Sequence, residues 1–481
     1  MKVKRLLAGV MALSLAAGFT ACGSTEEASD NTTEAATTTG TTAATVEINT
    51  EGLKEEEQSE LEIAMAKLPD RELEDTEIKW MSHYDLNPST TGESKKVELE
   101  MFEQKYGGTV TYYPTTYENR YNDLSTYILG GEGIDFFGED TYNFPKGIVS
   151  GMFQPIDDYI DLDSELWQQF SNAMDVFEFN GKHYQFVTNV YAEQVCLYNK
   201  ATIEENGFDD PWELYENGEW NWDTFREMLL QFVDEDSGKY GLDGWYNEKA
   251  LLLSAGVPFV GTDDSGSLVC NINDATIEKA MNYQYDLYCN GLAFPIDQFN
   301  WQIQTQKMGE GNELFLLYGT WGVQGDPSTW ASAIEPENLG IVPVPSPADS
   351  DPYQSAAISG YVLCKGASNP EGVAALAECA VVANTDEGLI AISGRKSKDD
   401  NEWTDEFIER KKEIDALARE YPVYDLASGC STEIASIATD GSEMGMRAAF
   451  HGVSWATNRD SIADTLIMLV DEVDQKLKSI E

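Results

Sequence analysis

The fold is decided by the stretches EIKWMSH (77–83), VELEMFEQKYGGTVTYY (97–113) and GGEGIDFF (130–137). Short runs rich in apolar, aromatic and β-branched residues predict buried strands at 77–83, 109–113 and 134–137. Apolar residues at helical spacing predict helices at 95–105 and 117–129, the second ending at a pair of glycines. A β-α-β-α-β order predicts a mostly parallel sheet with helices on both faces, so the expected fold class is α/β.

The rest of the folded body continues this alternation. Further strands are predicted at 182–186, 194–198, 314–318, 339–344 and 357–364. Further helices are predicted at 222–232, 274–289, 372–384 and 464–480. A body of roughly 400 residues exceeds what one hydrophobic core usually supports, so two lobes are expected. Because ligands of open α/β sheets bind beyond the carboxyl ends of the strands, functional residues are sought in the turns that follow strands.

The N-terminus has the layout of a secretory signal. Three basic residues within the first five precede an uncharged apolar run from 6 to 21. This run is too short and too rich in Ala and Gly to predict a membrane span. It ends at Ala21-Cys22, which resembles a bacterial lipobox, and the resemblance implies cleavage before Cys22 and a lipid anchor on that cysteine. The alternative is an ordinary signal peptide with an incidental cysteine.

The segment after the signal peptide is expected to be a tether. Residues 24–45 consist mostly of Ser, Thr, Ala and Glu without an aromatic residue, so they cannot bury enough apolar surface to offset their ordering entropy. Residues 51–67 have the composition of a loose acidic helix but are assigned to the same segment. The predicted organisation is therefore a signal peptide at 1–22, a disordered acidic tether at 23–75 and a folded body from 76 to 481.

The formal net charge of −54 restricts the partners of the protein. Nucleic acids and anionic membrane surfaces require basic patches, so neither is expected as a partner. No metal site is predicted, because the histidines at 83, 183 and 451 are not at ligand spacing from one another or from a cysteine. The sequence also lacks a phosphate-binding glycine motif, so no cofactor is predicted.

The cysteines other than Cys22 leave two possibilities open. They are Cys196, Cys270, Cys289, Cys364, Cys379 and Cys430. An even number outside the cytosol permits disulfides, and Cys270–Cys289 is then the first pair to test. Their spacing contains no paired motif, so buried free thiols are an equal alternative.

Short motifs follow one another along the body. They are IKW (78–80), FEQKY (102–106), GKHY (181–184), LYNK (197–200), NWDTF (221–225), KYGL (239–242), GTW (319–321), GIVPVP (340–345) and KGASNPE (365–371). In this order and spacing, together with the lipobox, they resemble the family 1 extracellular solute-binding proteins. The resemblance implies a periplasmic-binding-protein-like type II fold, in which crossover segments join two α/β lobes and a ligand cleft lies between them.

The same resemblance implies the boundaries of the lobes and the role of the protein. Crossovers are expected near 188–193, 342–345 and 391–395, with lobe I at 76–190 plus 343–390 and lobe II at 191–342 plus 391–481. The implied role is an exported receptor without catalytic residues, which captures a mono- or oligosaccharide and delivers it to the permease subunits of an ABC importer.

Candidate ligand-binding residues follow from the chemistry of sugars. A sugar ring needs aromatic planes for its C–H face and polar groups for its hydroxyls. The turns after predicted strands and the positions implied by the family supply such residues, with Trp321 foremost because it follows a buried strand and two small residues. The full set is Tyr84, Asp85, Glu139, Asp140, Tyr142, Tyr191, Glu193, Trp245, Tyr246, Trp321, Tyr361 and Trp455.

Two other functions remain open at this point. A secreted glycoside hydrolase needs two carboxylates flanking a sugar, and α/β alternation also suits a barrel enzyme. With 85 acidic residues, however, carboxylate pairs arise by chance, and the order of the motifs favours a receptor. A binding lipoprotein that serves as a sensor rather than in transport is the second alternative.

Overall fold

The computed structural model describes residues 55–86, 95–138, 144–263, 265–319, 322–323, 334–439 and 445–480. Residues 49–481 belong to one compact unit. The predicted signal peptide with Cys22 lies outside the described residues, and so do the candidates Glu139, Asp140, Tyr142 and Trp321. Among the described residues, no helix combines the length and the apolar composition needed to cross a bilayer.

The first sheet contains the strands predicted from the opening stretch. Its strands are β1 (Glu77–Ser82), β2 (Thr109–Pro114), β3 (Phe136–Gly138), β6 (Gln185–Ala192), β13 (Gln354–Leu363) and β14 (Pro422–Val423). Within the described residues their order is β14-β13-β3-β1-β2, with β6 also paired to β13. β1 runs parallel to β2 and β3, whereas β13 runs antiparallel to β3 and β6. The predicted α/β class is confirmed, with a mixed rather than a purely parallel sheet.

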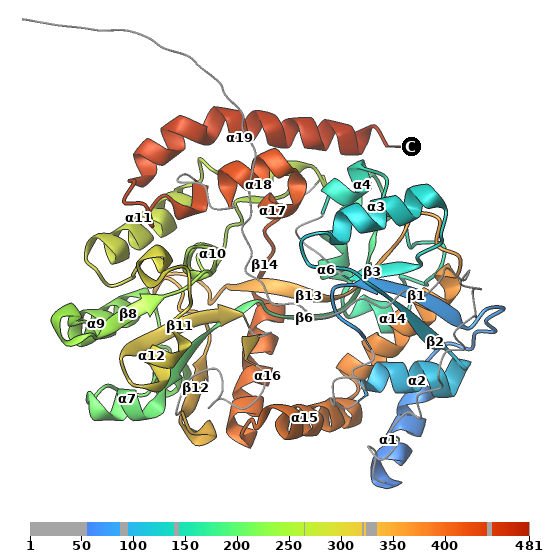
Figure 1. Ribbon diagram of the computed structural model, residues 1–481, viewed down its shortest axis with the longest axis horizontal. Coiled ribbons are helices and arrows are strands. Elements are labelled where there is room, and N and C mark those ends of the chain that lie inside the picture. Colours follow the sequence, from blue (N-terminus) through green and yellow to red (C-terminus); the bar gives the residue numbers. More distant parts are fainter. Residues whose placement is uncertain are drawn as a thin grey trace, which may run out of the picture. The chain divides into compact units, whose positions relative to one another are not determined.

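The second sheet is smaller and also mixed. Its strands are β7 (Gln194–Asn199), β8 (Tyr240–Asp243), β11 (Glu313–Gly319) and β12 (Leu339–Val342), in the order β12-β7-β11-β8. β8 runs parallel to β11, and β7 runs antiparallel to β11 and β12. In Figure 1 the paired strands β6 and β13 run between the two sheets. The chain leaves the first sheet with β6 and enters the second with β7, so it changes sheet at Glu193, within the range expected for the first crossover.

Short hairpins and many helices complete the body. The hairpins are β4 (Glu178–Phe179) with β5 (Lys182–His183), and β9 (Val260–Thr262) with β10 (Leu268–Cys270). The helices are α1 (Glu55–Met65), α2 (Val97–Tyr106), α3 (Arg120–Gly130), α4 (Lys146–Val149), α5 (Glu165–Gln168), α6 (Ser171–Asp175), α7 (Lys200–Glu205), α8 (Pro211–Glu216), α9 (Trp222–Phe232), α10 (Asn247–Leu253), α11 (Ala275–Cys289), α12 (Thr305–Gly309), α14 (Pro370–Thr385), α15 (Glu387–Asn401), α16 (Asp405–Glu420), α17 (Ala427–Cys430), α18 (Thr432–Ala438) and α19 (Trp455–Lys478). Single 3-10 turns are η3 (Glu235–Ser237), η4 (Ile296–Phe299), η6 (Pro336–Asn338) and η7 (Gly445–Arg447).

Two hydrophobic clusters correspond to the two sheets. The first surrounds the six-stranded sheet and extends to α10, α11 and the β9–β10 hairpin. The second surrounds the four-stranded sheet and includes Phe407 and Ile414 of α16. Buried residues of α17, α18 and α19, such as Cys430, Ile434 and Leu466, belong to the first cluster. α19 packs against β10 and α11 of the expected lobe II as well as against α4 of the expected lobe I. The expected assignment of residues 391–481 to lobe II therefore stays a prediction.

The third expected crossover, near residues 391–395, stays a prediction. Residues 391–395 lie inside α15, which is an uninterrupted helix. α15 packs against both α1 and α14, and Arg395 pairs with Glu57 of α1. The chain passes from the first hydrophobic cluster, which contains Ile392, to the second, which contains Phe407. The glycine at 394 is tolerated within this supported helix, although Gly lowers helix propensity by about 1 kcal/mol relative to Ala.

The C-terminal part of the expected tether is folded. α1 (Glu55–Met65) buries Leu61 and Ala64, and the following Leu68 is only 4% exposed. Just beyond it, Arg71 forms ion pairs with Glu371 (2.5 Å) and with the buried Glu378 (2.6 Å) of α14. The prediction of a disordered tether extending to residue 75 is corrected here. α1 and Arg71 pack against α14, which lies about 300 positions further along the chain.

The cysteines of the described residues are free thiols. Cys196, Cys364, Cys379 and Cys430 are buried, Cys270 is half-buried and Cys289 is exposed. The Cys270–Cys289 disulfide is therefore not present, and the alternative of unpaired thiols holds for these residues. Burial raises the pKa of Cys196 and of Cys364 well above the ordinary value, which makes both unreactive.

Candidate functional site

The carboxyl ends of strands from both sheets meet at a cavity of about 410 Å³. One wall carries Tyr117, which follows β2 of the first sheet. The other walls carry Trp245 and Tyr246, which follow β8 of the second sheet, and residues of the helices α10 and α17 and the turn η7. The complete lining is Tyr117, Trp245, Tyr246, Glu248, Lys249, Asp425, Ser428, Thr439, Met446 and Arg447. The rule that ligands bind beyond strand ends therefore leads to this cavity.

The aromatic wall on the side of the second sheet begins at the end of β8. Gly244 has a φ of 129°, and this conformation turns the chain from β8 towards α10. The ring of Trp245 stacks on that of Trp301, with centroids 5.4 Å apart, and Arg447 lies over Trp245 at 5.4 Å. Tyr246 contacts Tyr318 edge-on. Both Trp245 and Tyr246 were predicted from the sequence, and the structure brings them together at the cavity.

Trp301 extends this wall outward. It is 45% exposed and stacks on Phe450 as well as on Trp245. Its φ of 61°, next to Asn300 at 55°, lies in the left-handed region that is unfavourable for a bulky residue. Such conformations cost on the order of 1–3 kcal/mol and are concentrated at functional sites. Trp301 is not part of the cavity lining, and its exposed indole and left-handed backbone make it a further candidate for ligand contact.

The opposite wall is built on the first sheet. Tyr117 is 49% exposed, and the guanidinium of Arg120 lies 3.7 Å from the centre of its ring. His83 contacts the rings of both Tyr117 and Tyr84 edge-on, with centroids 5.3 and 5.1 Å apart. The predicted Tyr84 is 41% exposed and follows β1, so it extends the aromatic surface beside the cavity. The neighbouring Asp85 is half-buried and raises the pKa of Tyr112 after the larger effect of burial.

Buried carboxyl groups form the polar part of the lining. The hydroxyl of Tyr288 donates a hydrogen bond to Glu248, and burial raises the pKa of Glu248 despite this bond and the charge of Arg447. Asp425 accepts hydrogen bonds from the backbone N–H groups of Phe259, Val260 and Ala427, and burial raises its pKa as well. Together with Lys249 and Arg447, these groups give the cavity both acceptors and donors for a polar ligand.

Glu193 lies at the expected first crossover but does not line the cavity. Its Oε1 atom accepts a hydrogen bond from Lys249 (2.7 Å) and its Oε2 atom accepts one from Ser355 of β13 (2.7 Å). Burial alone would raise the pKa of Glu193, but the charge and hydrogen bond of Lys249, with further hydrogen bonds, hold it below the ordinary value. An ionised Glu193 therefore ties the β6–β7 crossover to β13 and α10, and its link with the cavity is Lys249.

Two predicted ligand residues are buried inside the protein. Trp455 is 1% exposed, begins α19 and packs against Phe259. Tyr361 is 7% exposed and packs edge-on against Trp80 and Phe136 beneath the first sheet. Both predictions are corrected, because a ring enclosed by the core cannot stack on a ligand. Tyr191 is half-buried within β6 and does not line the cavity.

Several lining residues were not predicted from the sequence. Tyr117 follows the end of β2 by three positions, but the predicted helix at 117–129 included it. Since α3 begins only at Arg120, Tyr117 lies in the turn after the strand, where the strand-end rule applies. Lys249 and Glu248 lie in the first turn of α10, directly after a predicted aromatic pair. Asp425 and Arg447 come from the C-terminal region, and no local pattern indicates that this region reaches the cavity.

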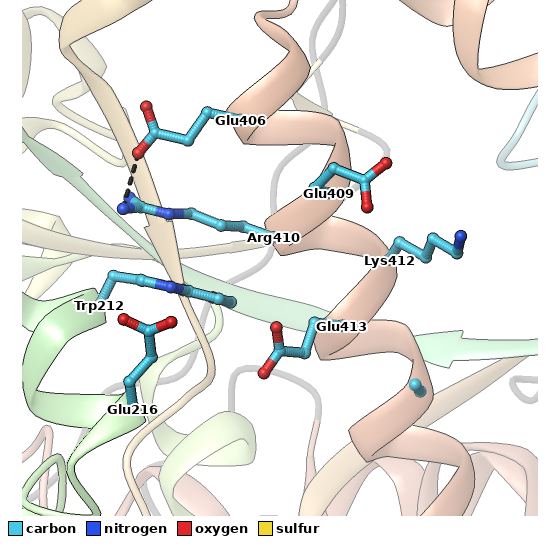
Figure 2. Close-up of a pocket in the computed structure, with 8 residues that line it drawn as sticks. Trp212, Glu216, Glu406, Glu409, Arg410, Lys412 and Glu413 are labelled. Carbon is cyan, nitrogen blue, oxygen red and sulfur yellow. Dashed lines mark ion pairs between the residues drawn. The ribbon is translucent and has the colours of Figure 1, made fainter. Parts of the chain in front are cut away.

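A second groove, of about 560 Å³, lies between α8 and α16 (Figure 2). Arg410 lies over the ring of Trp212 at 4.8 Å and pairs with Glu406 on its own helix. The aromatic plane of Trp212 is therefore already covered by a cation, and the remaining lining is mainly acidic. This groove lacks the exposed aromatic rings that distinguish the first cavity.

The fold and the sequence were compared with known proteins. No curated protein sequence matches the chain. Among solved structures, the sugar-binding protein MalE from the phytopathogen Xanthomonas citri has a TM-score of 0.60 at 13% identity, over 84% of this chain and 100% of that one. An ABC substrate-binding protein from Listeria monocytogenes in complex with cycloalternan has a TM-score of 0.57 at 15% identity, over 84% and 99%. These similarities confirm the two-lobed α/β fold of periplasmic binding proteins.

A third similar structure is the ABC transporter associated binding protein from B. animalis subsp. lactis Bl-04 in complex with β-1,6-galactobiose. Its TM-score is 0.54 at 15% identity, over 84% of this chain and 99% of that one. At the level of sequence families, residues 87–381 match the model of the bacterial extracellular solute-binding proteins. The match covers more than half of the chain and includes the first crossover and the aromatic turn after β8. The protein therefore belongs to the bacterial extracellular solute-binding protein family 1.

Proposed function

We propose that the protein captures a mono- or oligosaccharide in the cavity between Tyr117 and Trp245 and delivers it to the permease of an ABC importer. The observation that carries this proposal is the cavity lining itself. Aromatic residues from the two sheets, Tyr117 on one side and Trp245 and Tyr246 on the other, border one cavity with buried carboxyl groups and two cations. Aromatic planes and convergent polar groups are the two features that a sugar requires.

The structural relatives support the choice of a sugar. The three relatives described above are a protein named for sugar binding and two proteins solved with oligosaccharides, and the fold of this chain is the same. The cavity of about 410 Å³ is within the size range of small-molecule sites, roughly 300–1,000 Å³. Solute-binding proteins of this family are binding proteins rather than enzymes, so the lining carboxyl groups are assigned to hydrogen bonding and not to hydrolysis.

The proposal includes an anchor at Cys22. Family membership places the protein outside the cytoplasm. A lipid on Cys22 followed by a polar segment would hold the folded body near a membrane permease, which matches the role of delivering a captured solute. Mass spectrometry of the protein purified from membranes should show a diacylglycerol-modified Cys22 as the N-terminal residue, and a Cys22→Ala variant should be released into the soluble fraction.

A thermal-shift screen tests the sugar proposal. The purified protein is heated with a panel of mono- and oligosaccharides, and a ligand at 100 times its Kd should stabilise the folded state by about 2.7 kcal/mol. Each hit is then incubated with the protein, and the glycan is analysed for cleavage. Stabilisation without cleavage supports the receptor. Stabilisation by amino acids or peptides but by no glycan would contradict the proposed ligand class. Release of shorter sugars from a glycan would favour the alternative function, a glycoside hydrolase.

A further inference from the structure

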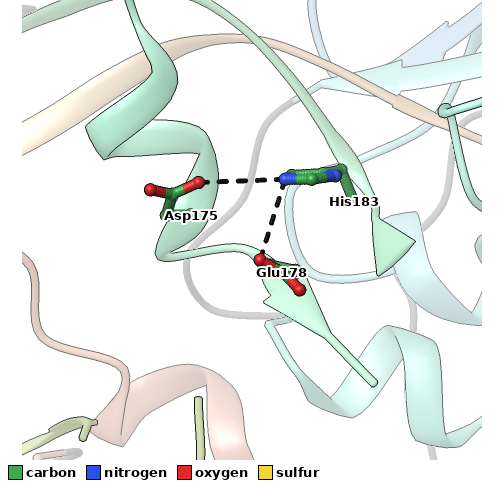
Figure 3. A group of neighbouring side chains, drawn as sticks. All are labelled: Asp175, Glu178 and His183. Atoms are coloured by element: carbon green, nitrogen blue, oxygen red, sulfur yellow. Dashed lines mark ion pairs between the residues drawn. The ribbon is translucent and has the colours of Figure 1, made fainter. Parts of the chain in front are cut away.

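A histidine and two carboxylates converge outside the cavity described above. His183 ends the β4–β5 hairpin, Glu178 begins it, and Asp175 is the last residue of α6 (Figure 3). The Nε2 atom of His183 lies 3.9 Å from Oδ1 of Asp175 and 4.0 Å from Oε2 of Glu178. One potential ligand atom from each of the three residues lies within 4.8 Å of the others. The three side chains therefore point towards one common position.

A fourth residue orients the imidazole. The Nδ1 atom of His183 lies 3.0 Å from Oδ1 of Asp157, and the backbone N–H of His183 donates to the other carboxylate oxygen of Asp157 at 3.1 Å. A carboxylate in this position fixes the hydrogen on Nδ1, which leaves the lone pair of Nε2 directed at Asp175 and Glu178. The same carboxylate–histidine arrangement supports metal-bound histidines in many proteins.

The charge and the accessibility of the group also suit a cation. Within the described part of the chain, neither Asp175 nor Glu178 forms an ion pair with a lysine or an arginine. The two side chains are 64% and 43% exposed, and both line a cavity of about 640 Å³ whose lining also includes the end of α19. The lysine in that lining, Lys478, is paired with Asp474 of its own helix. This cavity provides an access route and room for water ligands, and a divalent cation would neutralise the two neighbouring negative charges.

We infer that His183, Asp175 and Glu178 bind a divalent transition-metal ion of the zinc class. Zinc takes nitrogen and oxygen ligands at about 2.0–2.2 Å, which places neighbouring ligand atoms ~3.4 Å apart in a tetrahedral site. Each carboxylate oxygen needs to approach Nε2 by about 0.5 Å to reach this spacing, and the two oxygens, which lie within 4.8 Å of each other, would also close on the ion. Rotation of the two exposed side chains can supply this movement, and water from the cavity would complete the coordination. A calcium site is disfavoured, because calcium requires six to eight oxygen ligands and the group offers a nitrogen and two carboxylates.

The ion would join elements that are otherwise linked weakly. It would connect α6 to both strands of the two-residue β4–β5 hairpin, next to the point where Asn180 of the hairpin donates a hydrogen bond to the backbone of Ile480 after α19. This site shares no lining residue with the cavity that contains Tyr117 and Trp245. Metal binding is therefore independent of the proposed sugar binding, and each can fail without the other.

Calorimetric titration of the chelator-treated full chain with Zn²⁺ tests the inference. The wild type should bind one ion in a saturable step. Glu178→Gln and Asp175→Asn should each weaken this step by at least tenfold, and Asp157→Asn should weaken it by about 10- to 100-fold through the orientation of the imidazole. Asp158→Asn is the matched control, because Asp158 is the exposed neighbour of Asp157 and does not belong to the proposed site. This substitution removes the same charge as Asp157→Asn, and the Zn²⁺ affinity of the variant should equal that of the wild type.

A second measurement separates ligation from general attraction to an acidic protein. Co²⁺ bound through a histidine nitrogen in a low-coordinate site gives visible d–d absorption, which should appear in the wild type and in His451→Gln but not in His183→Gln. Circular dichroism checks that each variant is folded. Equal Zn²⁺ affinity in the wild type and in folded Glu178→Gln, or cobalt absorption that persists in His183→Gln, would overturn the assignment.

Discussion

Replacing Tyr117 by alanine should weaken sugar binding without unfolding the protein. Tyr117 lines the cavity, and Arg120 lies over its ring while His83 contacts the ring edge-on. The side chain is nevertheless 49% exposed, so about half of it is available to a ligand. An aromatic side chain of ~200 Å² then leaves about 100 Å² exposed, of which a sugar ring would cover about half. At ~25 cal/mol per Å², burying about 50 Å² contributes about 1.2 kcal/mol, which corresponds to an approximately eightfold increase in Kd for Tyr117→Ala.

Isothermal titration with the glycan that gives the largest thermal shift is the assay for this change. The matched control is Leu129→Ala, because Leu129 is 86% exposed on the adjoining α3 and does not line the cavity, so its Kd should stay at the wild-type value. The free energy of unfolding of Tyr117→Ala should fall by about 1 kcal/mol, since the half-exposed ring loses its contacts with Arg120 and His83. A Kd within twofold of the wild type would refute the assignment of Tyr117 to the ligand surface.

Three further changes test other parts of the structure. Leu61→Ala in α1 should destabilise the protein by about 2–5 kcal/mol in urea unfolding, whereas Ile63→Ala, on the exposed side of the same helix, should have little effect. Burial raises the pKa of Asp243 beside Glu313 to about 6, so stability from this carboxyl is complete below pH ~4 and is lost as the pH rises through about 6. Asp243→Asn should remove this loss, which is about 2 kcal/mol between pH 4.5 and 7.5. Lys249→Met should cost about 1.5–3 kcal/mol in unfolding free energy, because it removes the hydrogen-bonded cation from an ionised carboxylate, and a variant as stable as the wild type would show that this pair is not needed.

The sequence predicted the elements whose signals are local. The first five elements, from β1 to β3, agree with their predicted ranges because short β-rich runs, helical spacing and terminal glycines lie close together in the chain. The aromatic turn after β8 could be placed for the same reason, since a strand end and its following residues are adjacent. Trp245 and Tyr246 therefore lie in the cavity lining, after the strand end from which they were selected.

The errors concern features that depend on distant partners. α1 has few apolar residues and many acids, so its pattern predicts a solvated segment, and it is held by Arg71 and by packing on α14 and α15. Trp455 illustrates the consequence, because its small, polar sequence neighbours suggested a loop at the cleft, whereas α19 begins at this residue and buries it.

The position of Lys249 connects ligand capture with the geometry of the crossover. Lys249 lines the cavity and at the same time neutralises Glu193, where the chain passes from the first sheet to the second. A ligand shifts a conformational equilibrium only through contacts that are better in one state than in the other. A sugar held between Tyr117 and Trp245 makes both aromatic contacts only while the two sheets stay close together. A ligand hydroxyl that also bonds to Lys249 would compete with Glu193 for the same ammonium group. Ligand binding in the cavity would therefore change the contact that holds the β6–β7 crossover in place.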